Sequence, residues 1–211
     1  MSAPPFASLR AAAAEGAPAL GVVAGPNGAG KSIFIGHYLA GLGLPYVNAD
    51  HIARILREAN PALSPRELDR QAFEEAERLR DDLLRLRVSF CTETVFSDPV
   101  GSKLDFLGRA RAAGFFVTLV FIGLEHPAIS IGRVEQRVAQ GGHDVPPDRL
   151  LARFPRTLRN LRAAIPLVSE AVLFDNSAPD APYRFVARYE HGRLAARRPP
   201  VPRWTRGLPG L

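Results

Sequence analysis

Residues 19–32 read ALGVVAGPNGAGKS, an apolar run followed at once by a glycine-rich loop that ends in lysine and serine. The last eight letters match the pattern G-x-x-x-x-G-K-S/T, and the run before them is typical of a buried strand. Glycines let such a loop fold around a phosphate so that successive backbone N–H groups point inward. We expect Lys31 to reach the β- and γ-phosphates and the hydroxyl of Ser32 to bind Mg²⁺. The whole loop is predicted to bind ATP: Gly25, Pro26, Asn27, Gly28, Ala29, Gly30, Lys31 and Ser32.

The composition excludes several other classes of protein. Of the 211 residues, 46% are hydrophobic and 23% are charged, which is ordinary for one globular domain and excludes a disordered chain or a disulfide-rich toxin. The single cysteine, Cys91, cannot form an internal disulfide, so we expect a reducing, cytoplasmic location. No apolar run approaches the roughly 20 residues of a membrane helix, so we expect no membrane partner.

The charge pattern singles out the lysine of the loop. The formal net charge is +6, which favours anionic partners, and arginine supplies nearly all the positive charge. Only Lys31 and Lys103 are lysines, so a lysine inside the glycine-rich loop indicates a chemical requirement. This argues against the alternative that the loop is a turn that binds nothing.

Short apolar runs alternate with longer amphipathic segments, which is typical of an α/β domain with a parallel sheet. We predict a P-loop NTPase or kinase-type three-layer fold with a mainly parallel sheet of about five or six strands and a helical lid. The domain is expected to span 18–194 with its lid at about 127–165, after a flexible lead-in or short helix at 1–17 and before an irregular basic tail at 195–211. The expected strands are 19–24, 46–48, 88–93, 115–122, 171–174 and 183–189, the last turning at 191–192 into a short return. The expected helices are 31–43, 51–59, 64–87, 98–114, 127–139 and 147–164, the last broken near Pro155.

The absence of two sequence motifs excludes two classes of nucleotide-binding protein. An ATP-driven transporter or repair enzyme needs an L-S-G-G-Q-like signature and an aspartate–glutamate pair, but Asp175 is followed by Asn176. A GTPase needs an N-K-x-D segment to read guanine, and none occurs. A small kinase remains, because such enzymes place an acid after the second strand and arginines on a lid.

Two acidic strand ends fit a kinase. Asp50 and Asn48 close the second strand, at the sheet edge that carries the phosphate loop. We predict that Asp50 accepts a proton from the substrate hydroxyl and that Asn48 contacts the substrate; the alternative is that Asp50 caps the next helix. Glu93 and Thr94 close the third strand and are predicted to contact the substrate or a Mg²⁺-bound water, unless Glu93 serves only in a salt bridge.

The lid region is rich in arginine. Arg133 and Arg137 lie one helical turn apart, so they share a face and are predicted to stabilise the transferring phosphoryl group. Arg153 is expected to join them on ATP, with a solvated basic face as the alternative. His143, in the lid loop, either contacts the substrate phosphate or organises the turn, and Asn176 is placed where small kinases often bind adenine.

The motifs in combination resemble the zeta-toxin-like P-loop kinases. The segments that carry the resemblance are GPNGAGKS at 25–32, VNAD at 47–50, TETVFS at 92–97, RVEQRV at 133–138, GGHDVP at 141–146 and FDNS at 174–177. The resemblance implies ATP-dependent phosphorylation of a sugar hydroxyl, with UDP-N-acetylglucosamine as the acceptor, and an antitoxin protein as a possible partner. It assigns the base to Asp50 and phosphate contacts to Lys31 and Arg133. The longer toxins carry a second lid arginine where this chain has His143, so Arg137 or Arg153 would substitute.

Other functions stay open. The acceptor of such a kinase can instead be a nucleoside or an antibiotic hydroxyl, and a nucleotide-binding switch without phosphotransfer is a hypothesis of another class. Arginines of the tail, with Trp204, suggest nucleic-acid binding, but a proline-rich end more often packs on its own domain or stays mobile, so nucleic acid is an unlikely partner.

Overall fold

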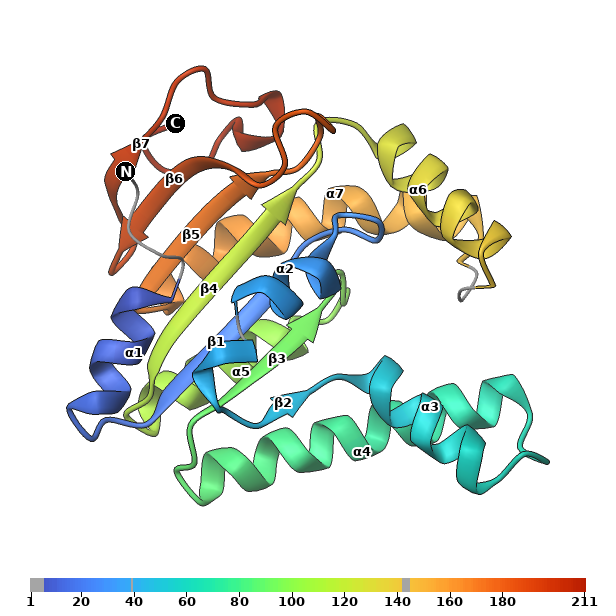
Figure 1. Cartoon of the computed structure of the whole chain (residues 1–211). Coiled ribbons are helices and arrows are strands. Elements are labelled where there is room, and N and C mark those ends of the chain that lie inside the picture. Colours follow the sequence, from blue (N-terminus) through green and yellow to red (C-terminus); the bar gives the residue numbers. More distant parts are fainter. Residues whose placement is uncertain (1–5, 39, 142–144) are drawn as a thin grey trace.

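The structure is a computed structural model that describes residues 6–38, 40–141 and 145–211. Its described strands form one sheet of seven, in the order β2-β3-β1-β4-β5-β6-β7 (Figure 1). The first five strands in this order run parallel, while β6 and β7 add an antiparallel hairpin at one edge. The strands are β1 Ala19–Ala24, β2 Tyr46–Val47, β3 Phe90–Thr94, β4 Phe116–Gly123, β5 Glu170–Asp175, β6 Arg184–Glu190 and β7 Arg193–Arg197. The predicted α/β fold is confirmed, and the sheet is wider than predicted because the short return pairs as a strand of its own.

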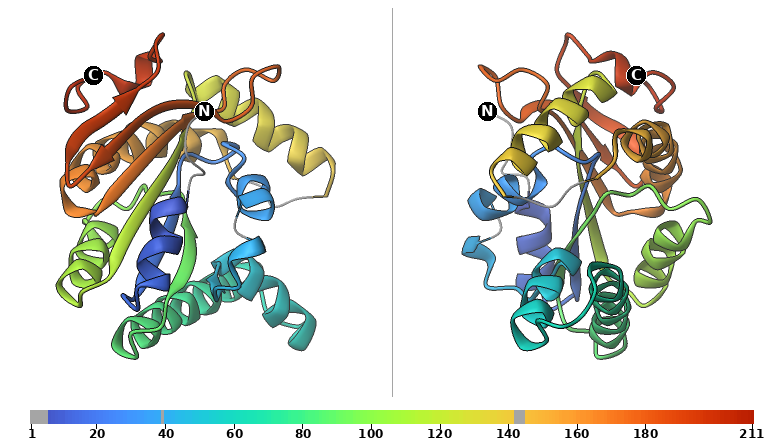
Figure 2. Two further views of the ribbon diagram at one scale, coloured as in Figure 1. Left: turned by 60° about the vertical axis from the view of Figure 1, so that its left-hand side comes forward. Right: turned by 90° about the vertical axis from the view of Figure 1, so that its right-hand side faces the viewer.

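Helices cover both faces of the sheet (Figure 2). The α-helices are α1 Ala7–Ala14, α2 Lys31–Tyr38, α3 Ala49–Ala59, α4 Pro65–Arg85, α5 Ser102–Ala112, α6 Pro127–Ala139 and α7 Pro147–Ala164. Single 3-10 turns form at Ala40–Leu42, Ile165–Leu167 and Arg203–Thr205. No helix within these described ranges has the length and apolar character that a membrane span requires.

Alternation along the strands divides the core into two layers. Successive side chains of a strand point to opposite faces, so Leu20 and Val22 of β1 pack with α4, α5 and α7, whereas Ala19 and Val23 pack with α1 and α2. All the residues of β1 are buried, as expected for a parallel strand covered on both sides. The central position of β1 fixes the loop that follows it.

The N-terminal helix belongs to this core. Phe6 and Leu9 are buried in the layer that α1 shares with α2, and the Ser8 hydroxyl donates to Glu170 of β5. Of the two alternatives left open for residues 1–17, the described part therefore adopts the short helix. The flexible lead-in is wrong from residue 6 onward.

Two helix predictions need correction. Helix α7 continues through Pro155, because Pro155 and Leu151, whose carbonyl loses its N–H partner, both lie on the exposed face where water can replace the bond. Helix α5 begins at Ser102 and not near Asp98, since Gly101 adopts φ 86° and interrupts the helical path.

The tail predicted to be irregular is built into the domain. Residues 193–197 form β7, and Trp204, only 6% exposed, packs its ring 5.6 Å from that of Phe121. The ring also lies against Gly123 at the end of β4, where any side chain would collide with it. Trp204 Nε1–H donates to Asp175 Oδ1 at 3.0 Å. Buried in this way, the indole is not presented for base stacking.

Candidate functional site

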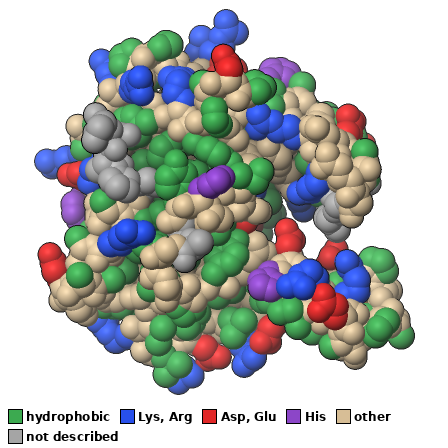
Figure 3. Space-filling model, viewed as in Figure 1, with side chains coloured by type: hydrophobic (Ala, Val, Ile, Leu, Met, Phe, Trp, Pro, Cys, Tyr) green, Lys and Arg blue, Asp and Glu red, His purple; other side chains and the backbone are tan. Residues whose placement is uncertain are grey.

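Two of the predicted catalytic residues, Asp50 and Arg137, line one cleft together with other predicted site residues. It has a volume of about 570 Å³ and lies between the α3–α4 pair and the lid helices α6 and α7, where Figure 3 shows a hollow with acidic and basic side chains gathered around it. The carboxyl ends of β1, β2 and β3 form its floor, as expected for a parallel sheet. Its lining includes these predicted site residues: Asn27, Asn48, Asp50, Glu93, Thr94, Arg137 and Arg153.

The phosphate loop is held from outside by side chains. Five successive carbonyl groups, from residue 26 to residue 30, each accept a hydrogen bond from a side chain at 2.7–3.3 Å. In order, the donors are Lys31, Ser130, Arg133, Asn176 and Tyr183. We call this set the carbonyl clamp. Because side chains hold these carbonyls, they do not turn toward a bound phosphate, and loop N–H groups other than that of Ala29, which donates to Pro26 O at 3.2 Å, can face the anion.

Glycine is required at two positions where the backbone of the phosphate loop lies closest to the carbonyl clamp and to the sheet. Gly25 has φ 150°, and a Cβ there would collide with the carbonyl of Ile122 in β4. Gly30 has φ 86°, and a Cβ there would lie 2.7 Å from the Tyr183 hydroxyl and 2.8 Å from Nδ2 of Asn176. The glycines therefore serve both the conformation of the loop and its close contact with the rest of the domain.

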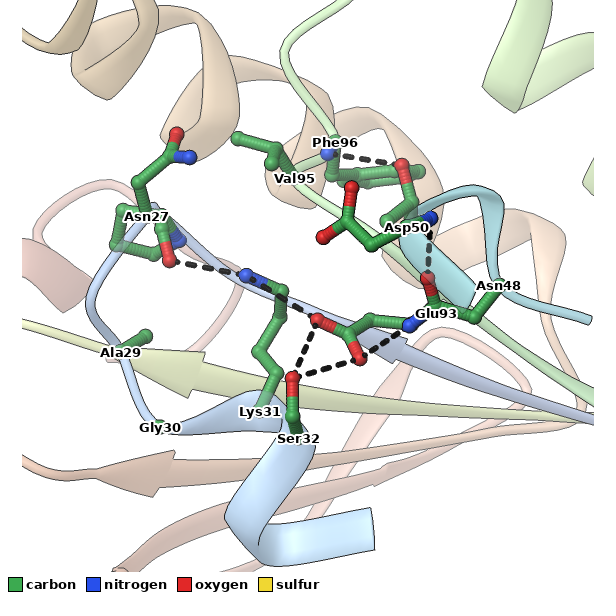
Figure 4. Close-up of polar contacts among 12 residues, drawn as sticks. Asn27, Ala29, Gly30, Lys31, Ser32, Asn48, Asp50, Glu93, Val95 and Phe96 are labelled. Carbon is green, nitrogen blue, oxygen red and sulfur yellow. Dashed lines mark hydrogen bonds and ion pairs between the residues drawn. The ribbon is translucent and has the colours of Figure 1, made fainter. Parts of the chain in front are cut away.

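Lys31 is buried at the start of α2, with only 7% of its surface exposed. Its ammonium group donates to Pro26 O at 3.1 Å and lies 3.8 Å from Glu93 Oε1 (Figure 4). Burial lowers the pKa of Lys31, while the charges of Glu93 and Asp50 act in the opposite direction. A buried cation beside the phosphate loop is suited to a highly charged anion.

Glu93 connects four side chains at the end of β3. Besides the ion pair with Lys31, its Oε2 accepts hydrogen bonds from Ser32 Oγ at 3.2 Å, Tyr46 OH at 2.8 Å and Asn48 Nδ2 at 3.0 Å. Burial and the charge of Glu93 raise the pKa of Tyr46, so the phenol stays a donor. The salt bridge considered as the alternative is present. The contact of Glu93 with substrate or a Mg²⁺-bound water stays a prediction, and the carboxylate lies beside both P-loop side chains that were predicted to hold phosphate and metal.

Asp50 is free of the capping role considered for it. Asn48 is the N-cap of α3, where its Oδ1 accepts from the N–H of Asp50 at 2.7 Å and of His51 at 3.3 Å. The exposed carboxylate of Asp50 accepts no hydrogen bond from the described residues, and it faces the ammonium of Lys31 together with Glu93 (Figure 4). Because Asn48, two residues earlier, is the cap, the Asp50 carboxylate is left to face the cleft.

Arg137 and Arg153 come to the cleft from the two lid helices, and the charge of Arg137 acts on Lys31. Arg133 instead donates to Gly28 O at 3.3 Å as part of the carbonyl clamp. Thr94 Oγ1 accepts from the Phe96 N–H at 3.0 Å. His143 lies outside the described residues.

The second half of the predicted lid belongs to the body of the domain. Leu161 and Ala164, near the end of α7, are fully buried in the layer that α7 shares with α4 and α5. Among the described residues of the predicted lid at 127–165, those that border the cleft are Arg137 of α6, Val145, and Arg153 and Arg156 of α7.

Tyr183 was missed by sequence reasoning, and Asn176 has a contact that was not foreseen. The amide of Asn176 donates to Ala29 O at 2.9 Å and accepts from the Tyr183 N–H at 3.2 Å, while the Tyr183 hydroxyl donates to Gly30 O at 2.8 Å. In the sequence, a tyrosine about 150 residues from the loop carries no signal of this role; only the asparagine after β5 did.

We expect Tyr183→Phe to weaken ATP binding about three- to tenfold, because one net hydrogen bond to the loop is lost. The effect should stay moderate, since Gly30 O also accepts from the Phe34 N–H and the ring stays packed 5.2 Å from that of Phe34. Calorimetric titration with ATP measures the change. The matched control is Tyr189→Phe, which removes a hydroxyl bonded to Pro209 O, far from the loop in the fold. Equal ATP affinity in the two variants would refute the role of Tyr183 in the clamp.

The residues present fit a magnesium ion held mainly by phosphate. Ser32 Oγ and the Glu93 carboxylate lie side by side next to Lys31, and among the described residues no group of three or more acidic, histidine or cysteine side chains forms a separate metal cage. Mg²⁺ prefers one or two protein oxygens together with phosphate oxygens and waters, which is what Ser32 and Glu93 offer.

Comparisons with known proteins agree with this geometry. A family model described as zeta toxin matches residues 7–177. An uncharacterised protein of Haemophilus influenzae is 28% identical over 130 residues, covering 62% of this chain and 88% of that protein.

Two solved structures share the fold. One is the AvrRxo1-ORF1:AvrRxo1-ORF2 complex with sulphate ions, with a TM-score of 0.69 and 20% identity, over 92% of this chain and 65% of that one. The other is from the PezAT chromosomal toxin-antitoxin system of Streptococcus pneumoniae, with a TM-score of 0.59 and 15% identity, over 89% of this chain and 81% of that one. With the match of the family model over most of the sequence, the chain belongs to the zeta toxin family of P-loop kinases.

Proposed function

We propose that the protein transfers the γ-phosphate of ATP to a hydroxyl group of a small molecule, and that this acceptor is a nucleotide sugar such as UDP-N-acetylglucosamine. The observation that carries the proposal is the exposed carboxylate of Asp50, which faces Lys31 across the open cleft. A carboxylate in this place serves an acceptor hydroxyl, whereas a protein that only binds nucleotide has no need of it.

The ATP end of the site is formed by the P-loop. Its N–H groups and Lys31 would hold the β- and γ-phosphates, because the carbonyl clamp keeps the loop carbonyls turned to their side-chain donors. A related fold, the AvrRxo1-ORF1:-ORF2 complex, has been solved with ATP, with a TM-score of 0.61. Ser32 and, through water, Glu93 would hold Mg²⁺, which neutralises charge on the phosphates when bound.

The chain's own groups account for the transfer. Asp50 accepts the proton of the acceptor hydroxyl as the oxygen attacks the γ-phosphorus, and the proton remains on the carboxylate until product leaves. Lys31 and Arg137 balance the negative charge that spreads over the phosphoryl oxygens, and ADP is the leaving group. Arg133 would donate to a phosphate oxygen with guanidinium N–H groups other than the one that donates to Gly28 O.

The experiment is an acceptor panel with ADP release as the readout and mass spectrometry of the products. We expect ADP formation to rise with UDP-N-acetylglucosamine and the acceptor to gain one phosphate. If only a nucleoside or an antibiotic stimulates ADP release, that compound is the acceptor and the nucleotide sugar is not. Tight ATP binding with no acceptor-stimulated ADP would instead support the nucleotide-binding switch.

An antitoxin partner is a further proposal that follows from the family. The PezAT structure belongs to a toxin-antitoxin system, and this chain resembles it over most of its length. Co-purification with the product of a neighbouring gene, followed by loss of acceptor-stimulated ADP release in the complex, would support such a partner.

A further inference from the structure

The cleft contains a carboxylate with no assigned role. Asp98 lines it, and both of its carboxylate oxygens are buried without a hydrogen-bond partner in the described parts of the chain. Burying a carboxylate without hydrogen bonds costs several kcal/mol, so native structures rarely leave such a group unsatisfied. Because Asp98 lines the cleft, a turn of its side chain would bring this unsatisfied carboxylate to a donor group of a bound substrate.

The backbone around Asp98 is fixed by α7. Asn160 Nδ2 donates to Phe96 O at 3.1 Å and to Asp98 O at 3.0 Å, and Thr157 Oγ1 donates to Val95 O at 3.1 Å. Both donors are buried on α7. These bonds hold the backbone after β3 against α7, with the Thr157 hydroxyl shared between Val95 O and Arg153 O, and so they keep residue 98 at the wall of the cleft.

Helix α7 also brings positive charge to the wall of the same cleft. Arg153 and Arg156, one turn before Thr157 and Asn160, also line the cleft, and the Nε of Arg156 is buried without a partner among the described residues. Burial lowers the pKa of Arg153, and the positive charges of Arg149 and Arg156 act in the same direction. An anionic group bound between Arg153 and Arg156 would relieve the repulsion between their charges.

Asp98 is separate from the groups that act on the γ-phosphate. The charges that act on Lys31 are those of Glu93, Asp50 and Arg137, and Asp98 is not among them. A role for Asp98 would therefore concern the binding of the acceptor and not the transfer step.

We propose that Asp98 is a specificity-determining residue of the acceptor site. Its carboxylate accepts hydrogen bonds from an O–H or N–H group of the acceptor, while Arg153 and Arg156 face the acceptor's phosphate. The acceptor class that fits is a sugar or nucleoside that already carries phosphate; a neutral nucleoside leaves the arginines unmatched, and a polycationic antibiotic is repelled by them. This inference rests on the proposed function.

The test compares Asp98→Asn with the wild type in steady-state kinetics on UDP-N-acetylglucosamine. We expect the KM for the acceptor to rise about ten- to a hundredfold, because an amide replaces a charged acceptor of hydrogen bonds. The KM for ATP should stay unchanged, and the melting temperature should not fall, because an amide costs less to bury than an unpaired carboxylate. Asp105→Asn is the matched control, since it removes the same charge from an exposed position in α5 outside the cleft.

The outcomes separate this inference from the proposed function. An unchanged acceptor KM in Asp98→Asn, with normal turnover, overturns the inference and leaves the kinase assignment standing. If the wild type transfers phosphate to no acceptor, the proposed function fails. The role of Asp98 in acceptor binding is then tested by measuring the equilibrium binding of UDP-N-acetylglucosamine. Weaker binding to Asp98→Asn than to the wild type supports the inference, and equal or absent binding overturns it.

Discussion

Replacing Asp50 with asparagine is expected to lower kcat for acceptor phosphorylation by about 100- to 10,000-fold, the usual loss when a general base is removed. ATP should bind as well as before or more tightly. The reason is that Asp50 contributes negative charge beside Lys31, where the triphosphate would lie, and asparagine removes that charge. Single-turnover measurement of phosphate transfer, with calorimetric titration of ATP, separates the two effects.

The control for Asp50 comes from the same helix. Glu58→Gln removes one carboxylate of α3 that pairs with Arg54 at the exposed surface, away from the cleft. We expect its kcat to match that of the wild type within about twofold, since exposed ion pairs contribute little. Turnover by Asp50→Asn at the rate of Glu58→Gln would remove the base from the proposed mechanism.

The second large effect is expected for Lys31→Met. Methionine keeps the length and apolar stem of the lysine but leaves the triphosphate facing Glu93 and Asp50 without the cation between them. Loss of one preorganised donor costs about 100- to 1,000-fold in kcat, and ATP affinity should fall as well. Measuring kcat/KM for ATP captures both losses together.

The fold should survive this substitution. Glu93 keeps hydrogen bonds from Ser32, Tyr46 and Asn48, so its carboxylate does not become an unsatisfied buried charge. We therefore expect circular dichroism and the melting temperature of Lys31→Met to stay close to the wild type. Arg57→Met, which removes one exposed positive charge from α3, serves as the control for net charge. Normal ATP affinity in Lys31→Met would contradict the role given to the lysine.

Much of the architecture could be predicted because its signals are local. The strand before the glycine-rich loop, the capping box at Ser64 and Glu67, and the proline at the start of α6 each follow from a few neighbouring residues. The placement of Asp50 and Glu93 at one edge of the sheet also followed, since parallel strands bring their carboxyl ends together.

The missed features depend on contacts between distant segments. Ser130 and Tyr183 join the carbonyl clamp from about 100 and 150 residues away along the chain, and no local pattern indicates such pairings. The sequence predicted Asp98 only as the start of a helix. That its buried carboxylate has no hydrogen-bond partner among the described residues depends on the folded structure and leaves no local pattern in the sequence. The helix through Pro155 escaped prediction for a similar reason: whether a lost backbone bond is tolerated depends on exposure to water.

The packing of Trp204 against the sheet has a consequence for folding during translation. Its ring rests on Gly123, one residue after the Ile122 carbonyl that presses against Gly25 at the entrance of the phosphate loop. A growing polypeptide on the ribosome can pair its first parallel strands early, but the contact of the Trp204 ring with Gly123 is missing until residue 204 has emerged. Nascent chains stalled before that point are therefore expected to retain ATP poorly.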